Sequence, residues 1–279
     1  MDIIHTIAQL RRRLETERRV ALVPTMGSLH AGHLDLVRAA KERIGNDGAV
    51  VVSIFVNRLQ FGPKEDFGKY PRTLIEDCDK CRAAGVDVVL APDESEMYPK
   101  PQTYFVEPPE IQHRLEGAVR PGHYRGVATV VLKLFNIVQP QVAVFGKKDY
   151  QQCRVLDNMV RQMNLPIEML LAETVRAADG LALSSRNVYL SPVERIEAPE
   201  LNRALRAILA ALHGGQRDFA ALELNAINNL KVRGWQPDYI TIARKRDLLP
   251  PTDEDRALVV LAAARLGSTR LIDNLEVAL

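Results

Sequence analysis

Cysteine is scarce in this sequence, and long hydrophobic runs are missing from it. Three cysteines among 279 residues are few and odd in number, which argues against a disulfide framework. No apolar run approaches the roughly 18 residues that cross a bilayer. The first 19 residues alternate apolar and basic side chains and have neither the apolar region nor the cleavage site of a signal peptide. We therefore expect a cytoplasmic protein with no membrane partner.

Neither sign of charge dominates, and aromatic residues are few. Lysine and arginine number 37 against 35 acidic residues, the net charge is +2, and only 5% of residues are aromatic. Nucleic-acid-binding proteins typically combine a basic surface with stacking aromatic side chains, so we expect no nucleic-acid partner. Hydrophobic residues make up 47% of the chain, which suffices for a core, and its 279 residues favour two domains.

Apolar runs typical of buried strands alternate with helical periodicity through the first part of the chain. We expect strands at 20–23, 49–56, 86–90, 141–145 and 167–171. We expect helices at 2–17, 30–44, 73–84, 127–138 and 150–163. This alternation predicts an α/β fold, a Rossmann-like parallel sheet with helices on both faces. Ligands of such sheets bind beyond the carboxyl ends of the strands.

The pattern changes after residue 176. A turn at 177–180 precedes helical segments at 192–213 and 219–233, and strand-like segments follow at 239–243, 257–264 and 269–272. Helices followed by clustered strands indicate a smaller α+β domain. We expect one domain at 1–176 and a C-terminal domain at 177–279.

The first predicted strand leads into a glycine-bearing loop with two histidines. His30, Gly32 and His33 lie where a helix is expected to begin, and the unpaired backbone N–H groups of a helix start bind anions. Gly27 and Gly32 have the spacing of a P-loop, but His33 stands where that motif needs lysine. Histidines at this position can donate hydrogen bonds to phosphate oxygens. A solvated or metal-binding histidine pair is the alternative.

Two further segments carry residues suited to phosphates. Gly146, Lys148 and Asp149 follow the predicted strand at 141–145, where lysine can reach a phosphate and aspartate can cap a helix or bind a ribose hydroxyl. Ser184 and Arg186 lie just past the change of pattern and offer a hydroxyl and a guanidinium to a triphosphate. Each segment alone is also typical of a solvated loop.

Together these segments resemble the pantoate–β-alanine ligase family. The matching motifs occur in the family's order at 26–33 (MGSLHAGH), 55–61 (FVNRLQF), 70–73 (YPRT), 120–123 (RPGH), 145–152 (FGKKDYQQ) and 180–187 (GLALSSRN). The resemblance runs through most of the first 190 residues and weakens beyond them. Near the C-terminus, 271–274 (LIDN) still looks like the family's ending.

The resemblance implies a nucleotidyltransferase-type ligase. Its substrates would be ATP, (R)-pantoate and β-alanine, and its products AMP, pyrophosphate and pantothenate, formed through a pantoyl adenylate. It also implies Mg²⁺ as the metal that accompanies ATP, a homodimer, and a first domain that binds ATP and pantoate while the C-terminal domain closes over the active site.

The resemblance also assigns residues, position by position. The ATP site would comprise Met26, Gly27, Ser28, Leu29, His30, Ala31, Gly32, His33, Gly146, Lys147, Lys148, Asp149, Val175, Leu183, Ser184, Ser185 and Arg186. Within this set the catalytic residues would be His30, His33, Lys148, Ser184, Ser185 and Arg186. Gln60 and Gln152 would hold pantoate, with Asn57 and His123 nearby, and Glu76 and Asp77 match the place where magnesium is held.

Two positions depart from the family's pattern. Lys147 stands where members commonly have glutamate, and Arg58 replaces the proline that usually follows the asparagine. Neither change removes a ligand assigned above. Lys147 is left as an additional candidate contact to phosphate.

Three other interpretations compete with this one. Cys78 and Cys81 form a CxxC, which suggests a metal or redox protein, but they lie in a predicted amphipathic helix with no second CxxC, so we expect them to be packing residues. Arg11, Arg12 and Arg13, with the resemblance of the histidine motif to tRNA synthetases, suggest RNA binding. The closest rival enzyme transfers AMP to a phosphate-bearing acceptor, which neutral glutamines suit less well than arginines would.

Overall fold

A computed structural model describes residues 1–45, 47–63 and 65–279. The chain forms two compact units. The first unit comprises Met1–Lys147 and Gln152–Glu173, and the second comprises Lys148–Gln151 and Thr174–Leu279. The boundary that we predict between residues 176 and 177 lies close to the change of unit at Thr174.

The first unit contains a six-stranded sheet in the order β1-β4-β3-β2-β5-β6, and every pair of neighbouring strands is parallel. The strands are β1 (Asp2–Ile4), β2 (Arg19–Thr25), β3 (Gly48–Ile54), β4 (Val88–Leu90), β5 (Val142–Gly146) and β6 (Glu168–Ala172). This sheet confirms the predicted Rossmann-like architecture.

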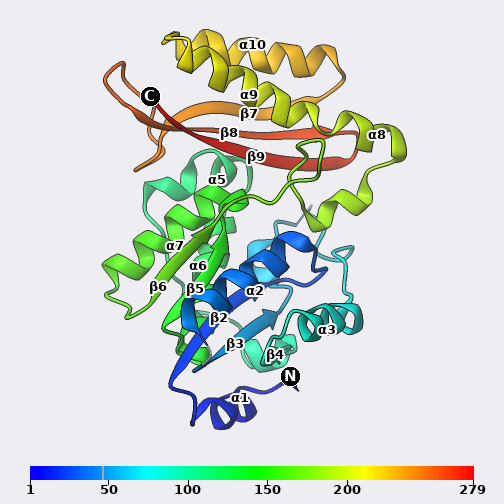
Figure 1. Cartoon of the computed structure of the whole chain (residues 1–279), viewed down its shortest axis with the longest axis vertical. Coiled ribbons are helices and arrows are strands. Elements are labelled where there is room, and N and C mark those ends of the chain that lie inside the picture. Colours follow the sequence, from blue (N-terminus) through cyan, green and yellow to red (C-terminus); the bar gives the residue numbers. More distant parts are fainter. Residues whose placement is uncertain (46, 64) are drawn as a thin grey trace. The chain divides into compact units, whose positions relative to one another are not determined.

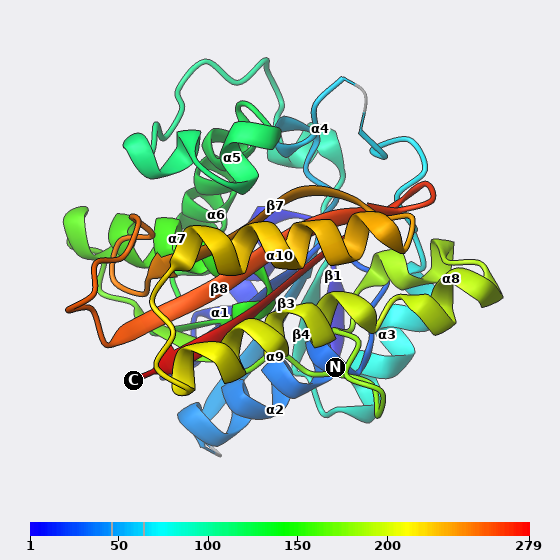
Figure 2. The same ribbon diagram turned by 90° about the horizontal axis from the view of Figure 1, so that it is seen from above.

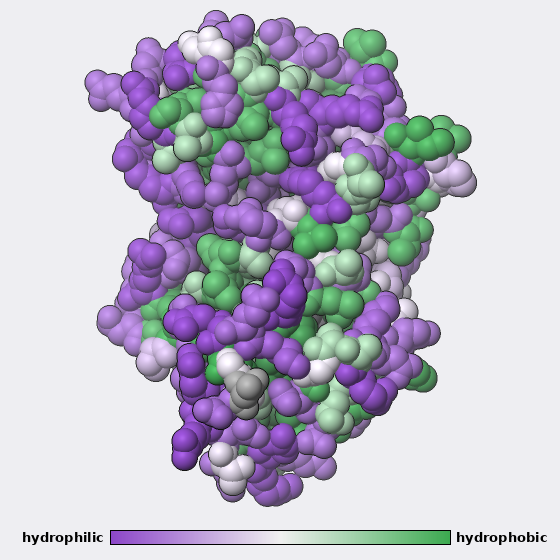
Figure 3. All heavy atoms as spheres, viewed as in Figure 1, coloured by the Kyte–Doolittle hydropathy of each residue, from purple (hydrophilic) through white to green (hydrophobic). Residues whose placement is uncertain are grey.

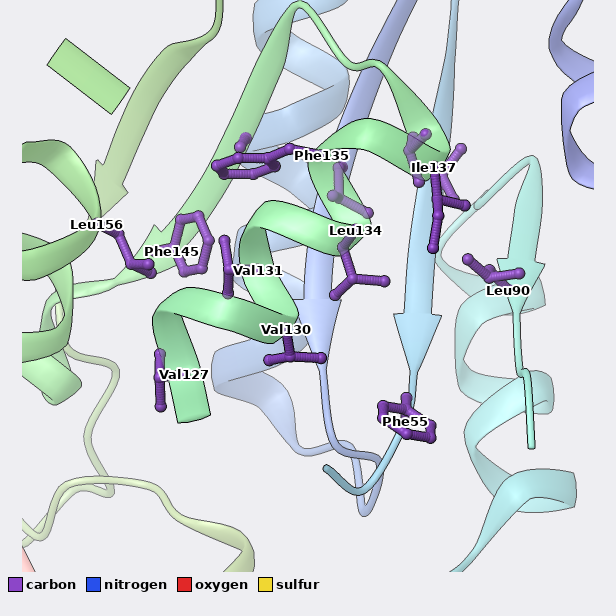
Figure 4. Close-up of a cluster of buried hydrophobic side chains, with 14 of the residues drawn as sticks. Phe55, Leu90, Val127, Val130, Val131, Leu134, Phe135, Ile137, Phe145 and Leu156 are labelled. Carbon is purple, nitrogen blue, oxygen red and sulfur yellow. The ribbon is translucent and has the colours of Figure 1, made fainter. Parts of the chain in front are cut away.

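Helices cover both faces of this sheet, as the continuous apolar runs predict. The long ones are α1 (Ile7–Leu14), α2 (Ala31–Ile44), α3 (Leu74–Ala83), α6 (His123–Val138) and α7 (Tyr150–Gln162). Buried side chains of α2 and α3 share one core with alternate strand residues such as Val23 and Val52. Those of α1, α6 and α7 share the opposite core, where the α6 side chains lie among Phe55, Leu90 and Phe145 (Figure 4).

Further short helical segments lie in both units. They are η1 (Arg58–Gln60), α4 (Glu94–Met97), η2 (Glu110–His113), α5 (Glu116–Val119), η3 (Lys147–Asp149) and η4 (Ser185–Tyr189).

The helix predicted at 2–17 is wrong over its first residues. Asp2, Ile3 and Ile4 form β1 instead and pair with β4 at the edge of the sheet. The helix begins only at Ile7, because Thr6 caps it by accepting a hydrogen bond from the backbone N–H of Gln9. Pairing with a strand more than 80 residues away outweighs the local helical periodicity.

The strand order places two loops at the point where ligands of such sheets bind. From β2 the chain proceeds to β3 and β4 in one direction, whereas β5 and β6 lie on the other side of β2 (Figure 1). The order therefore reverses between β2 and β5, and the crevice at such a reversal is the usual ligand site. The carboxyl end of β2 leads to Met26, and that of β5 leads to Lys147.

The second unit has a three-stranded antiparallel sheet formed by β7 (Gln236–Arg244), β8 (Ala257–Leu266) and β9 (Thr269–Ala278). Its helices α9 (Glu200–His213) and α10 (Phe219–Val232) lie side by side over this sheet (Figure 2). The single helix predicted at 192–213 is two helices, because α8 (Pro192–Glu197) ends before Pro199, which cannot continue a helix. This unit confirms the predicted smaller α+β region.

Within residues 1–45, 47–63 and 65–279, no helix is both long and apolar enough to span a membrane. On the face shown in Figure 3, small groups of hydrophobic side chains lie among hydrophilic ones.

Candidate active site

The loop between β2 and α2 follows an unusual backbone path. Gly27 has φ +84° and Ser28 has φ 52°, both in the left-handed region. A Cβ atom on Gly27 would lie 3.1 Å from Asp77 Oδ2 and 3.2 Å from Ile54 Cγ2. Only glycine combines this φ with such close approach at low cost. The backbone N–H of Gly27 also donates to Thr25 Oγ1 (3.2 Å), so the loop is tied to the end of β2.

Asp77 of α3 holds this loop from the other side. Its Oδ2 accepts the backbone N–H of Ser28 (2.8 Å), and its Oδ1 accepts that of Leu29 (2.7 Å). The hydroxyl of Thr73 donates to Oδ2 as well, at 3.1 Å. Asp77 is fully buried. Its carboxylate therefore accepts hydrogen bonds from backbone N–H groups that would otherwise lack partners.

His30 and His33 lie together at the start of α2, as their spacing predicts. Nδ1 of His30 accepts the backbone N–H of Gly32 (3.1 Å), and Nδ1 of His33 accepts that of His30 (3.3 Å). The ring centroids are 4.1 Å apart. A nitrogen that accepts a hydrogen bond carries no proton, so in each neutral ring the proton lies on Nε2. Each histidine thus presents an N–H donor at a helix amino terminus, the arrangement that favours an anion.

Glu76 and Asp77 do not fit a shared magnesium ion. Both oxygens of Asp77 already accept backbone N–H groups, whereas Glu76 is exposed. Adjacent helix positions point in different directions, which keeps the two carboxylates apart. Among the residues that the structure describes, no group of three or more His, Cys, Asp or Glu side chains could hold a metal.

A second cluster joins Met26 to three of the residues that the resemblance assigns to pantoate. Asn57 Nδ2 donates to Gln60 Oε1 (3.0 Å), and Gln60 Nε2 donates to Met26 Sδ (3.2 Å). The carbonyl of Gln60 accepts a hydrogen bond from His123 Nδ1 at 2.9 Å. Asn57 is 1% exposed and Gln60 9%. The cluster is therefore a neutral, buried, hydrogen-bonded wall beside the loop that follows β2.

Two residues that sequence reasoning left out of the site support this cluster. The hydroxyl of Tyr98 donates to Asn57 Oδ1 at 2.7 Å, and nothing local in the sequence marks that tyrosine. Arg120 lies in the quoted RPGH motif, and its guanidinium donates to the Gln60 carbonyl (3.3 Å) and to Glu65. It also donates to Nε2 of His123 at 3.1 Å.

Arg120 and the Gln60 carbonyl keep the His123 ring neutral. A carbonyl only accepts and a guanidinium only donates, so the His123 ring must carry its proton on Nδ1 and accept at Nε2. Burial, together with the charge of Arg120, lowers the pKa of His123 to about 4. Arg120 also lowers the pKa of Glu65 against the effect of burial. His123 is therefore a neutral positioning group for Gln60.

The segment after β5 divides between the two units. In the first unit, Lys147 forms an ion pair with Glu173, so this departure from the family's pattern has a partner within the chain. Gln152 lies in α7 and is half-buried. In the second unit, Lys148 Nζ lies 3.6 Å from Asp149 Oδ2.

The segment 175–186 forms a narrow turn in the second unit. The backbone N–H of Leu183 donates to the carbonyl of Val175 (3.0 Å), and Gly180 at the turn has φ +96°. Ser184 then caps η4, because its Oγ accepts the backbone N–H of Arg186 at 3.2 Å. Ser185 is buried, at 8% exposed. Backbone pairing thus brings Val175 beside Leu183, two residues that the resemblance assigns to ATP.

The CxxC residues are packing residues, as predicted. Cys78 is 4% exposed and Cys81 0%, and both lie in the core between α3 and the sheet. Burial raises the pKa of both thiols, that of Cys81 to about 12. Both thiols are therefore protonated and unreactive near neutral pH.

Known proteins resemble this chain along its whole length. The sequence profile of pantoate-beta-alanine ligase matches residues 2–276. A pantothenate synthetase of Leptothrix cholodnii is 57% identical over 285 residues, covering 99% of this chain and 100% of that protein. One from Neisseria meningitidis serogroup C is 58% identical over 280 residues, with both chains fully covered.

Solved structures give the same result. The pantothenate synthetase of Thermus thermophilus superposes with a TM-score of 0.94 at 46% identity, and both chains are covered completely. A pantoate-beta-alanine ligase of Francisella tularensis, complexed with beta-gamma ATP and beta-alanine, has a TM-score of 0.83 at 33% identity. It covers 99% of this chain, and 97% of that chain is covered. The family profile, the full-length relatives and the fold agree, and the chain belongs to the pantoate-beta-alanine ligase family.

Proposed function

We propose that this chain joins (R)-pantoate to β-alanine in two steps through a pantoyl adenylate. In the first step a pantoate carboxylate oxygen attacks the α-phosphorus of ATP, and pyrophosphate leaves. In the second step the β-alanine amine attacks the acyl carbon, loses a proton, and AMP leaves. The observation that carries the proposal is the loop after β2, where Asp77 holds the backbone and two histidines present N–H donors at a helix start.

Cationic and hydrogen-bond-donating residues suit ATP, whereas neutral amides suit pantoate. We propose that Met26–His33, Gly146–Asp149, Val175 and Leu183–Arg186 bind ATP, and that His30, His33, Lys148 and Ser184–Arg186 stabilise the negative charge that develops on phosphate oxygens. No side-chain nucleophile is needed. Gln60 and Gln152 bind pantoate, because neutral amides match its hydroxyls and carboxylate without adding charge. Asn57 and His123 orient Gln60. The Francisella relative, complexed with beta-gamma ATP and beta-alanine, supports ATP and β-alanine as substrates.

Three further proposals rest on the family resemblance. Mg²⁺ arrives as the counter-ion of ATP rather than in a site built from Glu76 and Asp77, the enzyme works in the cytoplasm, and it is a homodimer. Full activity in EDTA without divalent metal would contradict the first. Fractionation of cells would test the second, and sedimentation velocity at micromolar concentration would test the third.

The central test is pyrophosphate exchange. With ATP and Mg²⁺, pantoate alone should support incorporation of labelled pyrophosphate into ATP, and release of AMP should require β-alanine in addition. Exchange that strictly depends on β-alanine would contradict a free adenylate. Exchange driven by a phosphorylated acceptor instead of pantoate would favour the rival AMP transferase, which the neutral Asn57 and Gln60 cluster disfavours.

A further inference from the structure

The buried carboxylate of Asp273 in β9 accepts hydrogen bonds from three residues of the second unit. Its Oδ1 accepts hydrogen bonds from Arg176 Nη2 (2.7 Å) and from the backbone N–H of Asn274 (2.7 Å). Its Oδ2 accepts from Arg176 Nη1 (2.8 Å) and Asn202 Nδ2 (2.9 Å). The side chain is 3% exposed. A bidentate guanidinium pair of this kind fixes orientation as well as distance.

Arg176 connects Asp273 to the turn at 175–183. Beyond Asp273, its guanidinium donates to the carbonyls of Gly180 (3.1 Å) and Asn274 (3.1 Å). Arg176 itself pairs with Ala182 as an isolated antiparallel bridge. The Arg176 side chain therefore links the tip of the turn to strand β9, while its backbone pairs across the base of the turn. The turn leads directly into Ser184 and Arg186.

The residue next to Asp273 holds a different loop. Asn274 is 5% exposed, and its Nδ2 donates to the backbone carbonyl of Lys148 at 3.0 Å. Lys148 belongs to the same unit. Two consecutive residues of one strand thus tie down two segments that the proposed function assigns to the phosphates of ATP.

We propose that Asp273 and Asn274 are positioning residues that hold the Lys148 backbone and the Ser184–Arg186 segment in one fixed arrangement for ATP. Neither residue is proposed to contact substrate. They act through Lys148 and through Arg176, which places the hydroxyls and guanidinium that follow the turn. The inference rests on the proposed function, because it assumes that these two segments bind ATP.

The sheet offers a matched control pair. Arg270 of β9 donates through Nε to Asp238 of β7 at 2.6 Å, and their side chains are 14% and 25% exposed. This ion pair joins β7 and β9 of the same sheet, whereas the hydrogen bonds that hold Lys148 and the turn at 175–183 run through Asp273, Asn274 and Arg176. Asp238→Asn therefore removes a partly buried ion pair from the same unit without releasing either loop.

The test compares Asp273→Asn, Asn274→Ala and Asp238→Asn in the full-length enzyme. We expect Asp273→Asn to raise KM for ATP by about tenfold or more, because misplaced binding groups lose much of their effect. Asn274→Ala removes the hydrogen bond to the Lys148 carbonyl and should raise KM for ATP about three- to tenfold. KM for pantoate should change less than about twofold in both, and Asp238→Asn should leave KM for ATP within about twofold of wild type.

Stability is measured in parallel by thermal unfolding. If Asp273→Asn does not fold, Asn274→Ala decides the question, and an unchanged KM for ATP in that folded variant overturns the proposal. Equal rises in KM for ATP in Asp273→Asn and Asp238→Asn also overturn it, since they would mark a general structural role. A wild-type enzyme that releases no AMP with all three substrates contradicts the proposed function instead.

Discussion

The carboxylate of Asp77 accepts the backbone N–H of Leu29 at 2.7 Å, although the two residues are separated by 48 positions in sequence. The contact links the first turn of α3 to the loop that precedes α2. Both oxygens of this buried carboxylate face backbone donors of the loop, so its role is to position the loop. The geometry of the histidine loop therefore depends on α3.

Replacing Asp77 separates loop positioning from metal binding. Asp77→Ala leaves the N–H groups of Ser28 and Leu29 without partners, each at a cost of about 1–3 kcal/mol if it stays buried. We expect pyrophosphate exchange to fall on the order of a hundredfold from misplacement of the loop. Raising the Mg²⁺ concentration should not restore it. Glu76→Gln is the neighbouring control and should keep near wild-type exchange; rescue of Asp77→Ala by Mg²⁺ would show a metal ligand instead.

His33 and Lys148 should matter far more for the first step than for the second. Removing one preorganised donor to a developing charge costs about 2.7–4 kcal/mol, a loss on the order of a hundred- to a thousandfold. His33→Ala and Lys148→Ala should each show this loss in adenylate formation. Conversion of supplied pantoyl adenylate, which expels no pyrophosphate, should be much less affected. Single-turnover measurements of each step test this, and equal losses in both would contradict it.

Lys147→Glu is the control for that pair of variants. It restores the family's usual residue but places a carboxylate beside Glu173, whose side chain is 81% exposed. The Lys147 side chain is 16% exposed, but the ion pair opens to solvent at Glu173, and ion pairs at the surface contribute about 0–1 kcal/mol, so both steps should change only a few-fold. Exchanging the charges in Lys147→Glu with Glu173→Lys should remove even that effect. A severe defect in Lys147→Glu would mean that Lys147 rather than Lys148 contacts the phosphates.

His123 should make the protein less stable in mild acid. Its pKa is lowered to about 4 in the folded state, whereas an unfolded histidine titrates near 6.5. Between these values the unfolded chain binds more protons, so the free energy of unfolding decreases as pH falls from 6.5 to 4, by at most about 1.4 kcal/mol per pH unit. Urea unfolding across this range should show a flatter profile for His123→Gln. His213→Gln, at an exposed helix end, should keep the wild-type slope, and a wild-type slope in His123→Gln would contradict the prediction.

The buried cysteines should be needed for stability rather than for catalysis. Serine at Cys78 and Cys81 places hydroxyls in an apolar core, which should lower the free energy of unfolding by about 1–3 kcal/mol for each unpaired hydroxyl. Turnover of the folded double variant should stay within a few-fold of wild type. The native protein should react only slowly with a thiol reagent, since all three cysteines are buried. Loss of a stoichiometric metal ion on substitution would revive the metal interpretation.

The sequence by itself determined the Rossmann-like sheet and the position of the histidine loop. Both depend on local patterns: continuous apolar runs mark strands buried on two faces, and a glycine-bearing segment between strand and helix predicts an anion site. His30 and His33 meet because the N-cap of a helix and the residue three positions later lie close together. The same periodicity failed at residues 2–4, where pairing with β4 decided the conformation.

Only the tertiary structure decided which residues hold these loops in place. Asp77 looked like half of an acidic pair, Tyr98 carried no local signal, and Asp273 was only part of a family-like ending. Their partners lie 48, 41 and 97 positions away, respectively, at Leu29, Asn57 and Arg176. A buried polar group needs a hydrogen-bond partner, and the fold decides which residue that partner is. Local sequence patterns do not show which distant residue the fold brings there. The hydrogen bonds that position the site are long-range, whereas the motifs that mark it are local.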